Sequence, residues 1–342
     1  MRQTCCEYPH AGPDLSPAGH SRPEWAYRPG VDSEPSDEVI VVGSGVAGLT
    51  TAVVLAESGR RVRVWAREPA ERTTSAVAGG LWWPYRIEPE PLVGAWALAS
   101  LTVYEELARR PQETGVRLVD GVHRGARLDG LGAWAGRVAG LRAVAEGLAA
   151  RLPLIDMPVH LAWLRERLVE AGGVVEVREV PALAAVPAPV VVNCTGLGAR
   201  SLVPDPAVRP VRGQLVVVEN PGITTWFTSV EHASDASTYF MPQPGGLLLG
   251  GTAEDDDWSL RPDPATAAAI VARCAAVRPE IARARVLGHR VGLRPARDAV
   301  RLERQRLADG RVLVHNYGHG GAGITVAWGC ARQAAELAFP AA

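Results

Sequence analysis

The chain of 342 residues contains no lysine, so all 36 of its basic side chains are arginines. A phosphate-binding loop of the Walker A type needs a lysine, and so do a pyridoxal phosphate Schiff base and an aldolase-type nucleophile. The absence of lysine therefore excludes these three kinds of site.

Net charge is also nearly absent, because 37 acidic residues balance 36 basic ones and leave a charge of −1 at pH 7. We therefore expect no nucleic-acid partner and no anionic membrane partner. The longest uncharged window, residues 180–199, contains three prolines and cannot form a membrane span. No apolar run follows the first arginine, so we expect no signal peptide either.

Cysteine is scarce, with five residues and no metal-type spacing such as C-x2-C. The five are Cys5, Cys6, Cys194, Cys274 and Cys330. This usage predicts a reduced, intracellular chain without a metal site. Apolar residues make up 47% of the sequence, which allows a large core. The length predicts roughly two domains, or one large one.

Order along the chain is expected to begin at residue 38. Residues 1–37 hold six prolines and no periodicity, which predicts a disordered leader; a recognition arm and a start codon placed too far upstream are the alternatives. Glu38–Val42 predicts a buried parallel strand, 46–58 a helix that stops at Gly59, and 61–65 a second strand. Strand, glycine turn, helix and strand together form a βαβ unit.

Periodicity predicts the remaining elements and a fold class. Strands are expected at 174–177, 190–193, 214–219, 238–241, 247–250 and 311–315, and helices at 158–171, 265–277 and 322–337. The pattern predicts an α/β fold in which a nucleotide-binding domain of the Rossmann type is interrupted by a sheet-rich second domain.

The turn after the first strand carries a dinucleotide-binding pattern. Its six residues, Gly43, Ser44, Gly45, Val46, Ala47 and Gly48, fit G-x-G-x-x-G between a strand and a helix. The first glycine permits the turn, the second lets backbone approach a pyrophosphate, and the third packs helix on strand. Glu68 ends the second strand, where a carboxylate can bind a ribose diol. The alternative is a glycine turn that serves packing only.

The motif alone does not distinguish NAD from FAD, but two other segments favour FAD. Small residues at 78–80 allow main chain to lie flat against a flavin ring, after a polar segment of Thr73, Thr74 and Ser75. The glycine-rich run 319–325 opens the last helix and exposes N–H groups to an anion or a carbonyl group.

With these segments in view, the sequence resembles the D-amino-acid oxidase family of flavoproteins over residues 38–340. The motifs that carry the resemblance, in order, are VVGSGVAGL, TTSAVAGGLWWPY, IDMPVHLAWL, VVNCTGLGAR, PVRGQL, TYFMPQ, LGGT, VGLRPARDAVRLE and HNYGHGGAGIT. The resemblance implies a glutathione-reductase-type FAD domain from residues 38–83, 153–200 and 290–342. Residues 84–152 and 201–289 would then form an antiparallel substrate domain.

The resemblance also implies positions for the cofactor. The pyrophosphate turn would be Ser44 to Ala47, and the ribose region Arg67 and Glu68. The remaining expected contacts are Thr73, Thr74, Ser75, Gly80 and Leu81 for the flavin loop, Val180, Thr195 and Gly196 near the adenine, and Gly320, Gly321, Gly323, Ile324 and Thr325 for the carbonyl edge of the ring.

For the substrate, the resemblance makes Arg294 of VGLRP the carboxylate clamp and Tyr239 of TYFMPQ its partner. A guanidinium can donate two parallel bonds to a carboxylate and stays charged at any working pH. The carbonyl of Gly321 is the expected acceptor for the substrate amine. An ordinary ion pair for Arg294 and an ordinary strand aromatic for Tyr239 are the alternatives.

Two departures from mammalian family members bear on specificity. Asp235 stands where a lid tyrosine is expected, and the loop 228–237 is short, so lid gating of product release is in doubt. Trp83 replaces a glutamine, and Met241 is expected to line the pocket, so we expect an apolar side-chain pocket. His232 is not a convincing second clamp, which argues against D-aspartate as the preferred substrate.

Other residues have a simpler interpretation. We expect His319 to be structural rather than a base, Cys194 to be in the core rather than covalently attached to flavin, and residues 254–257 to be a solvated loop rather than a metal site. Most of the ten tryptophans should serve packing, apart from Trp82 and Trp83.

The resemblance implies oxidation of neutral or apolar D-amino acids to 2-oxo acids with release of ammonia and hydrogen peroxide. A hydride would pass from the substrate α carbon to flavin N5, with O2 as the final acceptor, and the protein would act chiefly by orientation. The alternatives are a glycine or secondary-amine oxidase, an NAD-linked dehydrogenase, and a non-catalytic FAD-binding sensor; a homodimer also remains open.

Two further expectations follow from the resemblance. The C-terminal Pro340, Ala341 and Ala342 differ from the peroxisomal tripeptide of eukaryotic relatives. Together with the arginine-only, alanine- and glycine-rich composition, this leads us to expect a bacterial cytoplasmic enzyme. Without lysine, the negative charge of the reduced flavin would be stabilised by the N-terminus of the last helix, worth about 0.5–2 kcal/mol from the helix dipole.

Overall fold

The fold begins with the βαβ unit that the sequence predicts. The computed structural model describes residues 37–84, 87–230 and 236–340. Strand β1 (Glu38–Val42), helix α1 (Val46–Glu57) and strand β2 (Arg61–Ala66) follow one another, and β1 pairs with β2 in parallel. The predicted leader lies outside the described residues except for Asp37, whose carboxylate pairs with Arg60 at 2.6 Å.

All described strands join one sheet of 14 strands. Its parallel end has the order β14-β7-β1-β2-β6, in which β6 is Val174–Val177, β7 is Val190–Asn193 and β14 is Val312–His319. Strand β7 is buried along its whole length and β1 from its second residue, as their continuous apolar runs predict for a sheet covered on both faces.

The rest of the sheet is mostly antiparallel, and its order runs β4-β5-β3-β9-β10-β11-β8-β13. The bounds are β3 Val116–Arg124, β4 Arg142–Val144, β5 Gly147–Ile155, β8 Arg209–Val218, β9 Trp226–Val230, β10 Ala236–Gln243, β11 Gly246–Thr252, β12 Glu254–Asp255 and β13 Val286–Arg306. Strand β13 joins the two parts because it pairs with β8 on one side and β14 on the other.

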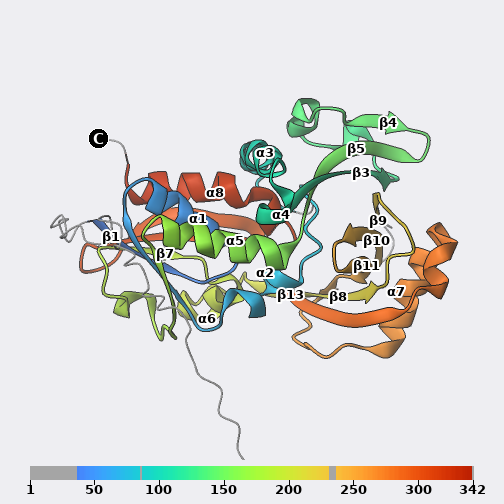
Figure 1. Ribbon diagram of the computed structural model, residues 1–342. Helices are drawn as coiled ribbons and strands as arrows, with labels where there is room; N and C mark the ends of the chain where they lie inside the picture. The colour runs from blue at the N-terminus through green and yellow to red at the C-terminus, as the bar shows by residue number, and fades with distance from the viewer. Residues whose placement is uncertain (1–36, 85–86, 231–235, 341–342) are drawn as a thin grey trace, which may run out of the picture. The chain divides into compact units, whose positions relative to one another are not determined.

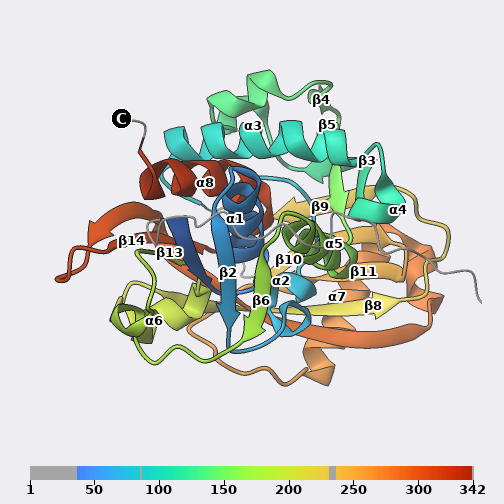
Figure 2. The same ribbon diagram turned by 60° about the vertical axis from the view of Figure 1, so that its left-hand side comes forward.

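Different helices cover the parallel and the antiparallel parts of the sheet. The bounds are α2 Thr74–Val77, α3 Glu90–Leu107, α4 Pro111–Thr114, α5 Met157–Glu170, α6 Ala199–Leu202, α7 Pro264–Val277 and α8 Gly323–Ala338. Helices α8, α1 and α5 lie side by side over the parallel strands, and α3 lies on α8 (Figures 1 and 2). Helix α7 packs against β8, β10 and β11.

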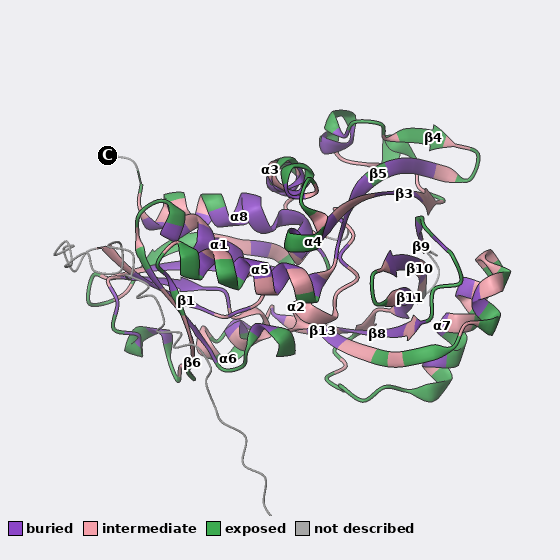
Figure 3. Ribbon diagram, viewed as in Figure 1, coloured by how far each residue is buried: buried purple, intermediate pink, exposed green. Residues whose placement is uncertain are grey.

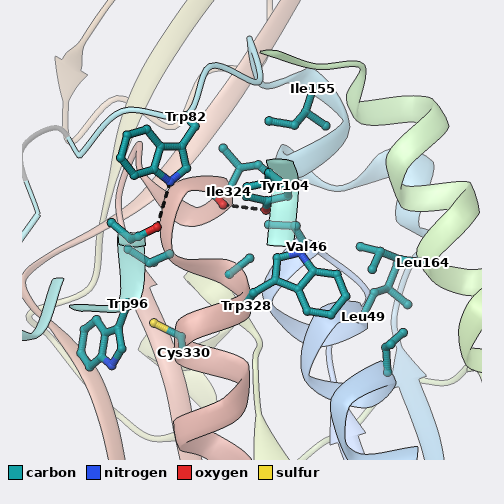
Figure 4. Packing of buried hydrophobic residues seen from close by; sticks show 14 of the residues in the cluster. Val46, Leu49, Trp82, Trp96, Tyr104, Ile155, Leu164, Ile324, Trp328 and Cys330 are labelled. Atoms are coloured by element: carbon teal, nitrogen blue, oxygen red, sulfur yellow. Dashed lines mark hydrogen bonds between the residues drawn. The ribbon is translucent and has the colours of Figure 1, made fainter. Parts of the chain in front are cut away.

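The main hydrophobic core lies where these helices meet the sheet. Helix α8 is buried along most of its length, as are the strands beneath it (Figure 3). The indole N–H of Trp82 donates to the carbonyl oxygen of Ala97 at 3.1 Å (Figure 4). The hydroxyl of Tyr104 donates to the carbonyl oxygen of Ile324 at 2.8 Å. These two bonds tie helices α3 and α8 to the segment that follows α2.

The fold class is therefore a mixed α/β fold with a large sheet, as expected. The assignment of residues to an FAD domain and a substrate domain stays a prediction. Among the described residues, no helix combines the length and the apolar composition needed to cross a bilayer.

Candidate active site

The glycine turn between β1 and α1 is shaped by close backbone contacts. Gly43 has φ +115°, and a Cβ placed there would lie 2.4 Å from the carbonyl oxygen of Cys194. A Cβ on Gly48 would lie 1.9 Å from the carbonyl oxygen of Gly43. These two glycines are thus required by packing. In contrast, a Cβ on Gly45 would meet only the hydroxyl of Ser75, at 3.1 Å, so Gly45 leaves room in front of the helix N-terminus.

The N-cap residue of α1 is Gly45, which has no side chain that could bond to the N–H groups at the helix N-terminus. The N–H of Val46 donates to Oγ of Ser75 at 3.0 Å, which brings the expected flavin loop to the phosphate-binding turn. Ala47 follows Val46 in the same first turn, where free N–H groups and the helix dipole favour an anion. The arrangement suits a pyrophosphate.

The expected ribose and adenine positions gather at the carboxyl ends of the parallel strands. The hydroxyl of Ser44 donates to the carbonyl oxygen of Glu68 at 2.9 Å, and Arg67 beside it is exposed. Val180 is half-buried against the core of β1 and β2. Thr195 and Gly196 follow β7, and the hydroxyl of Thr195 donates to Asn193 at 2.7 Å. Open α/β sheets bind nucleotides at this edge.

The expected flavin loop packs directly on β13. Thr73 is the N-cap of α2, and the hydroxyl of Thr74 donates to the carbonyl oxygen of Leu293 at 3.0 Å. A Cβ on Gly292 would lie 3.4 Å from the side chain of Val77, so α2 lies over this part of the strand. The loop is therefore adjacent to Arg294, one residue beyond Leu293.

After α2 the loop is held against β5. Gly80 has φ +82°, and a Cβ there would lie 2.0 Å from the carbonyl oxygen of Ile155, so a side chain is excluded. Leu81 forms a bridge with Leu154. Backbone alone thus occupies the position of Gly80, as expected for a segment that lies flat against a ring.

The glycine-rich entry to α8 lies beside this loop and α1. The N–H of Gly320 donates to the carbonyl oxygen of Pro295 at 2.9 Å, and Gly323 begins the helix. A Cβ on Gly323 would lie 3.9 Å from Val46, so α8 and α1 begin next to each other. The hydroxyl of Thr325 donates to the carbonyl oxygen of Trp83 at 3.1 Å, which ties the first turn of α8 to the segment that follows the expected flavin loop.

Arg294 lies half-buried next to this entry, and no described carboxylate forms an ion pair with it. Its Nη1 donates to the carbonyl oxygen of Thr252 at 2.9 Å. A Cβ on Gly321 would lie 3.4 Å from Cδ of Arg294, and one on Gly213 would lie 2.4 Å from its Nη2. The glycines therefore make room for a guanidinium whose positive charge has no acidic partner in the described chain.

Tyr239 meets the same short segment as Arg294. Its ring covers Gly250 and Gly251, and a Cβ on Gly251 would lie 2.7 Å from the tyrosine hydroxyl oxygen. Thr252, the next residue, accepts the bond from Arg294. The phenol and the guanidinium thus converge on three consecutive residues, as a two-point carboxylate site requires.

His319 is held as a neutral structural histidine. Its side chain is buried, and Nε2 lies 3.0 Å from Oδ1 of Asn316. Burial lowers the pKa of His319 to about 4. Burial also raises the pKa of the Cys194 thiol to about 12, so this thiol stays protonated in the core. At neutral pH the His319 ring is neutral but only weakly basic, and the Cys194 thiol is protonated and therefore a poor nucleophile.

We predict that stability falls as the pH drops from 7.5 to 5. Burial lowers the pKa of both His160 and His319 to about 4, against 6.5 for a free histidine. Because the folded pKa is depressed, the stabilisation is complete above pH 6.5 and is lost as the pH falls toward 4. The loss should approach roughly 2–3 kcal/mol for each histidine at pH 4, measured by urea unfolding.

The matched variant is His319→Gln, which should flatten the pH dependence over the same range. An unfolding free energy that stays constant or rises between pH 7.5 and 5, or an unchanged slope in the variant, would show that these rings are not buried as neutral groups.

The acidic run 254–257 differs from the solvated loop that we expected. Glu254 and Asp255 form strand β12 on β8, and the buried guanidinium of Arg212 pairs with Glu254 and lies 3.6 Å from Asp257. The loop is ordered because this arginine would otherwise be a buried charge without a partner. No group of metal-ligating residues occurs among the described residues.

Arg212 is largely engaged within the protein. It donates to the carbonyl oxygens of Ser259 at 2.9 Å and Arg261 at 2.7 Å, and to Oε1 of Gln214 at 2.9 Å. With the bond to Glu254, four of its five N–H groups have partners within the protein, and its charge is balanced by Glu254 and Asp257. Arg212 is therefore a poor second carboxylate clamp.

The aromatic residues of LWWPY have different roles. Trp82 is buried in the core with its ring edge-on to Trp134. Trp83 is 9% exposed and packs against Trp134 and His123. Met241 lies against the loop, since a Cβ on Gly79 would be 2.7 Å from its sulfur. The expected loop residues 231–235, including His232 and Asp235, lie outside the described residues.

Gln243 has a role that the sequence did not suggest. Its Nε2 donates to the carbonyl oxygens of Gly79 and Ile155, at 3.0 Å each, and its Oε1 accepts from Arg117 at 3.1 Å. One amide therefore joins β10 to the flavin loop and to β5. Its place at the end of TYFMPQ was visible in the sequence, but its partners are far away along the chain.

We predict that Gln243→Leu weakens FAD binding about tenfold and destabilises the fold. The change leaves the carbonyls of Gly79 and Ile155 without a donor, which costs about 1–3 kcal/mol. The dissociation constant of FAD and the urea unfolding midpoint measure the two effects. Gln112→Leu, at an exposed position of α4, is the control and should change neither. Equal values for both variants would refute the role of Gln243.

The glycines and helix N-termini fit FAD. Helices α1 and α8 begin side by side, and neither is capped by the side chain of its own N-cap residue. The guanidinium of Arg294, which has no acidic partner among the described residues, lies beside Gly321 at the entry to α8. A dinucleotide needs N–H donors at its pyrophosphate, and a reduced flavin needs positive potential at its carbonyl edge. The described residues supply both.

The comparisons with known proteins agree with this arrangement. The FAD dependent oxidoreductase model named DAO matches residues 38–162 and 154–337. The chain is 70% identical to a D-amino-acid oxidase of Streptomyces coelicolor, over 90% of this chain and 98% of that protein. It is 49% identical to a D-amino-acid oxidase of Rubrobacter xylanophilus, over 87% and 95%.

A solved structure, the glycine oxidase of Geobacillus kaustophilus, has the same fold. The TM-score is 0.72 at 21% identity, over 88% of this chain and 94% of that one. The family match and the two relatives settle the cofactor as FAD. The chain belongs to the DAO family of FAD-dependent oxidoreductases.

Proposed function

We propose that the protein oxidises neutral or apolar D-amino acids with O2 and water to 2-oxo acids, ammonia and hydrogen peroxide. The observation that carries the proposal is Arg294, a half-buried guanidinium without an acidic partner in the described chain, held by Thr252 beside Tyr239 and Gly321. Two relatives named D-amino-acid oxidase, at 70% and 49% identity, support it.

The carboxylate of the substrate would bind between two donors. Within the described parts of the chain, the guanidinium of Arg294 bonds to the carbonyl oxygens of Arg212 and Thr252, and both bonds come from Nη1. Nη2 and Nε can therefore form charge-assisted bonds with a carboxylate. The hydroxyl of Tyr239 lies on the same segment and can add a third bond. Together they would fix the carboxylate in one orientation.

The amine would then be directed to the entry of α8. Gly321 is exposed and lies against Arg294. With the substrate carboxylate bound to Arg294, the α carbon and its amine would be close to the backbone of Gly321. The bound FAD supplies the two-electron acceptor, which O2 reoxidises. The protein needs no strong base for this step if the amine binds neutral, which agrees with the neutral state of His319.

Preference for neutral or apolar side chains is part of the proposal. Trp83 and Met241 are apolar residues next to the flavin loop, and the buried Arg212 is already paired with Glu254. A distal carboxylate buried there would lack a partner, which costs several kcal/mol.

A substrate panel with peroxide readout tests the proposal. D-methionine and D-alanine should be turned over at least tenfold more efficiently, in kcat/KM, than D-aspartate, glycine, sarcosine or L-amino acids. Higher efficiency on glycine or sarcosine would make the protein a secondary-amine oxidase of the same fold. Bound FAD without turnover of any member of the panel would make it a sensor.

We also propose that this activity is cytoplasmic. The described cysteines, Cys194, Cys274 and Cys330, are all free and buried, which supports a reducing compartment. Fractionation of the native cells with antibody detection tests the location, and recovery outside the cytoplasmic fraction would refute it.

A further inference from the structure

A cavity of about 250 Å³ borders the expected flavin loop at Ala78, and Arg294 is not among its lining residues. Its wall comes from five parts of the fold: the end of α2, the start of α5, β8, the β10–β11 hairpin and β13. The lining residues that matter here are Ala78, Asp156, Met157, Gln243, Leu248 and Arg290.

The cavity is separate from Arg294 although both involve β13. Arg290, Gly292 and Arg294 alternate along the strand, so their side chains lie on one face of the sheet. Helix α2 packs over Gly292, because a Cβ there would lie 3.4 Å from Val77. The two arginines therefore lie on opposite sides of α2.

The cavity contains two opposite charges that do not meet. Among the described residues, neither the carboxylate of Asp156 nor the guanidinium of Arg290 takes part in a hydrogen bond or an ion pair. Asp156 is the N-cap residue of α5, a position where an aspartate usually accepts a bond from the helix, yet its side chain makes no such bond. Both charges thus keep their capacity for a ligand.

The third nearby charge is already engaged. Nη2 of Arg117 donates to the carbonyl oxygen of Pro242 at 2.6 Å and to Gln243 at 3.1 Å, and its guanidinium attracts Asp156 only across space. The remaining wall is apolar, from Ala78, Met157 and Leu248. The lining of the cavity therefore combines one positive side chain, one negative side chain and several apolar side chains.

We propose that this cavity is an accessory site for a small zwitterionic α-amino acid. Arg290 binds the carboxylate, Asp156 binds the ammonium group, and the apolar wall contacts the side chain. A ligand with only one charge would leave the other residue unpaired, so both charges are needed for binding. This inference goes beyond the proposed oxidation and does not depend on it.

The test is binding of L-alanine to the FAD-loaded protein by isothermal titration calorimetry. Arg290→Gln and Asp156→Asn should each weaken binding at least tenfold, and acetate or methylammonium alone should bind at least tenfold more weakly than L-alanine. Arg283→Gln, at an exposed arginine outside the cavity, is the matched control and should bind as the unchanged protein does.

Arg294→Ala separates this site from the active site, because it should retain binding of L-alanine. Peroxide measured in the same samples reports turnover independently, so failure of one proposal is distinguishable from failure of the other. The accessory site is refuted if L-alanine does not bind, if binding is lost in Arg294→Ala, or if either Arg290→Gln or Asp156→Asn binds normally. Circular dichroism confirms folding, and the two cavity variants test the site from opposite ends.

Discussion

Replacement of Arg294 by alanine is expected to lower kcat/KM for D-alanine and D-methionine by about 10²- to 10³-fold. Truncation of one partner of a buried charge-assisted pair costs about 2–5 kcal/mol, and 1.4 kcal/mol corresponds to a factor of ten. Most of the effect should appear in KM, because the guanidinium binds a carboxylate that does not itself react. Steady-state peroxide formation measures both constants.

Two variants make this result specific. Arg294→Lys keeps the charge but loses the planar pair of donors, so it should fall between the alanine variant and the unchanged protein. Arg283→Gln, at an exposed position, should leave kcat/KM unchanged. A value for Arg294→Ala within threefold of the unchanged protein would show that this arginine does not bind the substrate.

Gly45→Leu is expected to raise the dissociation constant of FAD at least 100-fold while the fold persists. Gly45 has φ −70° and ψ 178°, which any residue can adopt, and a Cβ there meets only the movable hydroxyl of Ser75. The added side chain would occupy the space in front of α1, where the pyrophosphate must approach. Titration with FAD and circular dichroism measure the two properties separately.

Gly48→Ala provides the contrast, because its Cβ would lie 1.9 Å from the carbonyl oxygen of Gly43. Overpacking of this kind costs about 1–3 kcal/mol or more, so this variant should lose stability before it loses FAD specifically. Gly130→Leu, where a Cβ meets nothing within 4 Å, is the control for both. Normal FAD affinity in Gly45→Leu would mean that the turn does not hold the pyrophosphate.

The parallel half of the fold could be predicted because its signals are local. Strands Glu38–Val42, Val174–Val177 and Val190–Asn193 were predicted at their observed bounds. Buried parallel strands have continuous apolar runs, and the glycine turn marks where the first strand ends. Helices α5, α7 and α8 were within one residue of the predicted ends, since Pro158 and the glycine-rich run mark two of the beginnings.

The joining strand β13 and the far end of the sheet could not be predicted in this way. Strand β13 contains Gly288, Gly292 and Pro295, residues that a strand interior usually avoids. They are tolerated because α2 packs on Gly292, and because Pro295 lies opposite Pro210 in β8. Helix α3 and strands β3 and β5 also went unpredicted, since their stability depends on contacts between distant segments.

The site shows the same division between local and distant information. The motifs predict Arg294, Tyr239 and the glycine turns as site residues, because their chemistry depends on residue type and local order. The partners that hold them, Thr252 for Arg294 and Gln243 for the flavin loop, are 42 and 88–164 residues away from the groups they bind. Those contacts require the sheet register, which no single segment specifies.

The complete absence of lysine limits how the reduced flavin can be stabilised. The described residues offer the N-terminus of α8, entered through Gly320 and Gly321, and the guanidinium of Arg294 close to it. We propose that these two sources of positive potential take the place of a lysine beside the ring.

Anaerobic mixing of the yellow holoenzyme with single D- and L-amino acids tests the central claim most directly. The account predicts that D-methionine and D-alanine remove the visible flavin absorption within the turnover time, that their L-enantiomers do not, and that O2 restores the colour with one hydrogen peroxide per flavin. A flavin that D-amino acids leave oxidised, or that L-amino acids or glycine reduce faster, would contradict it.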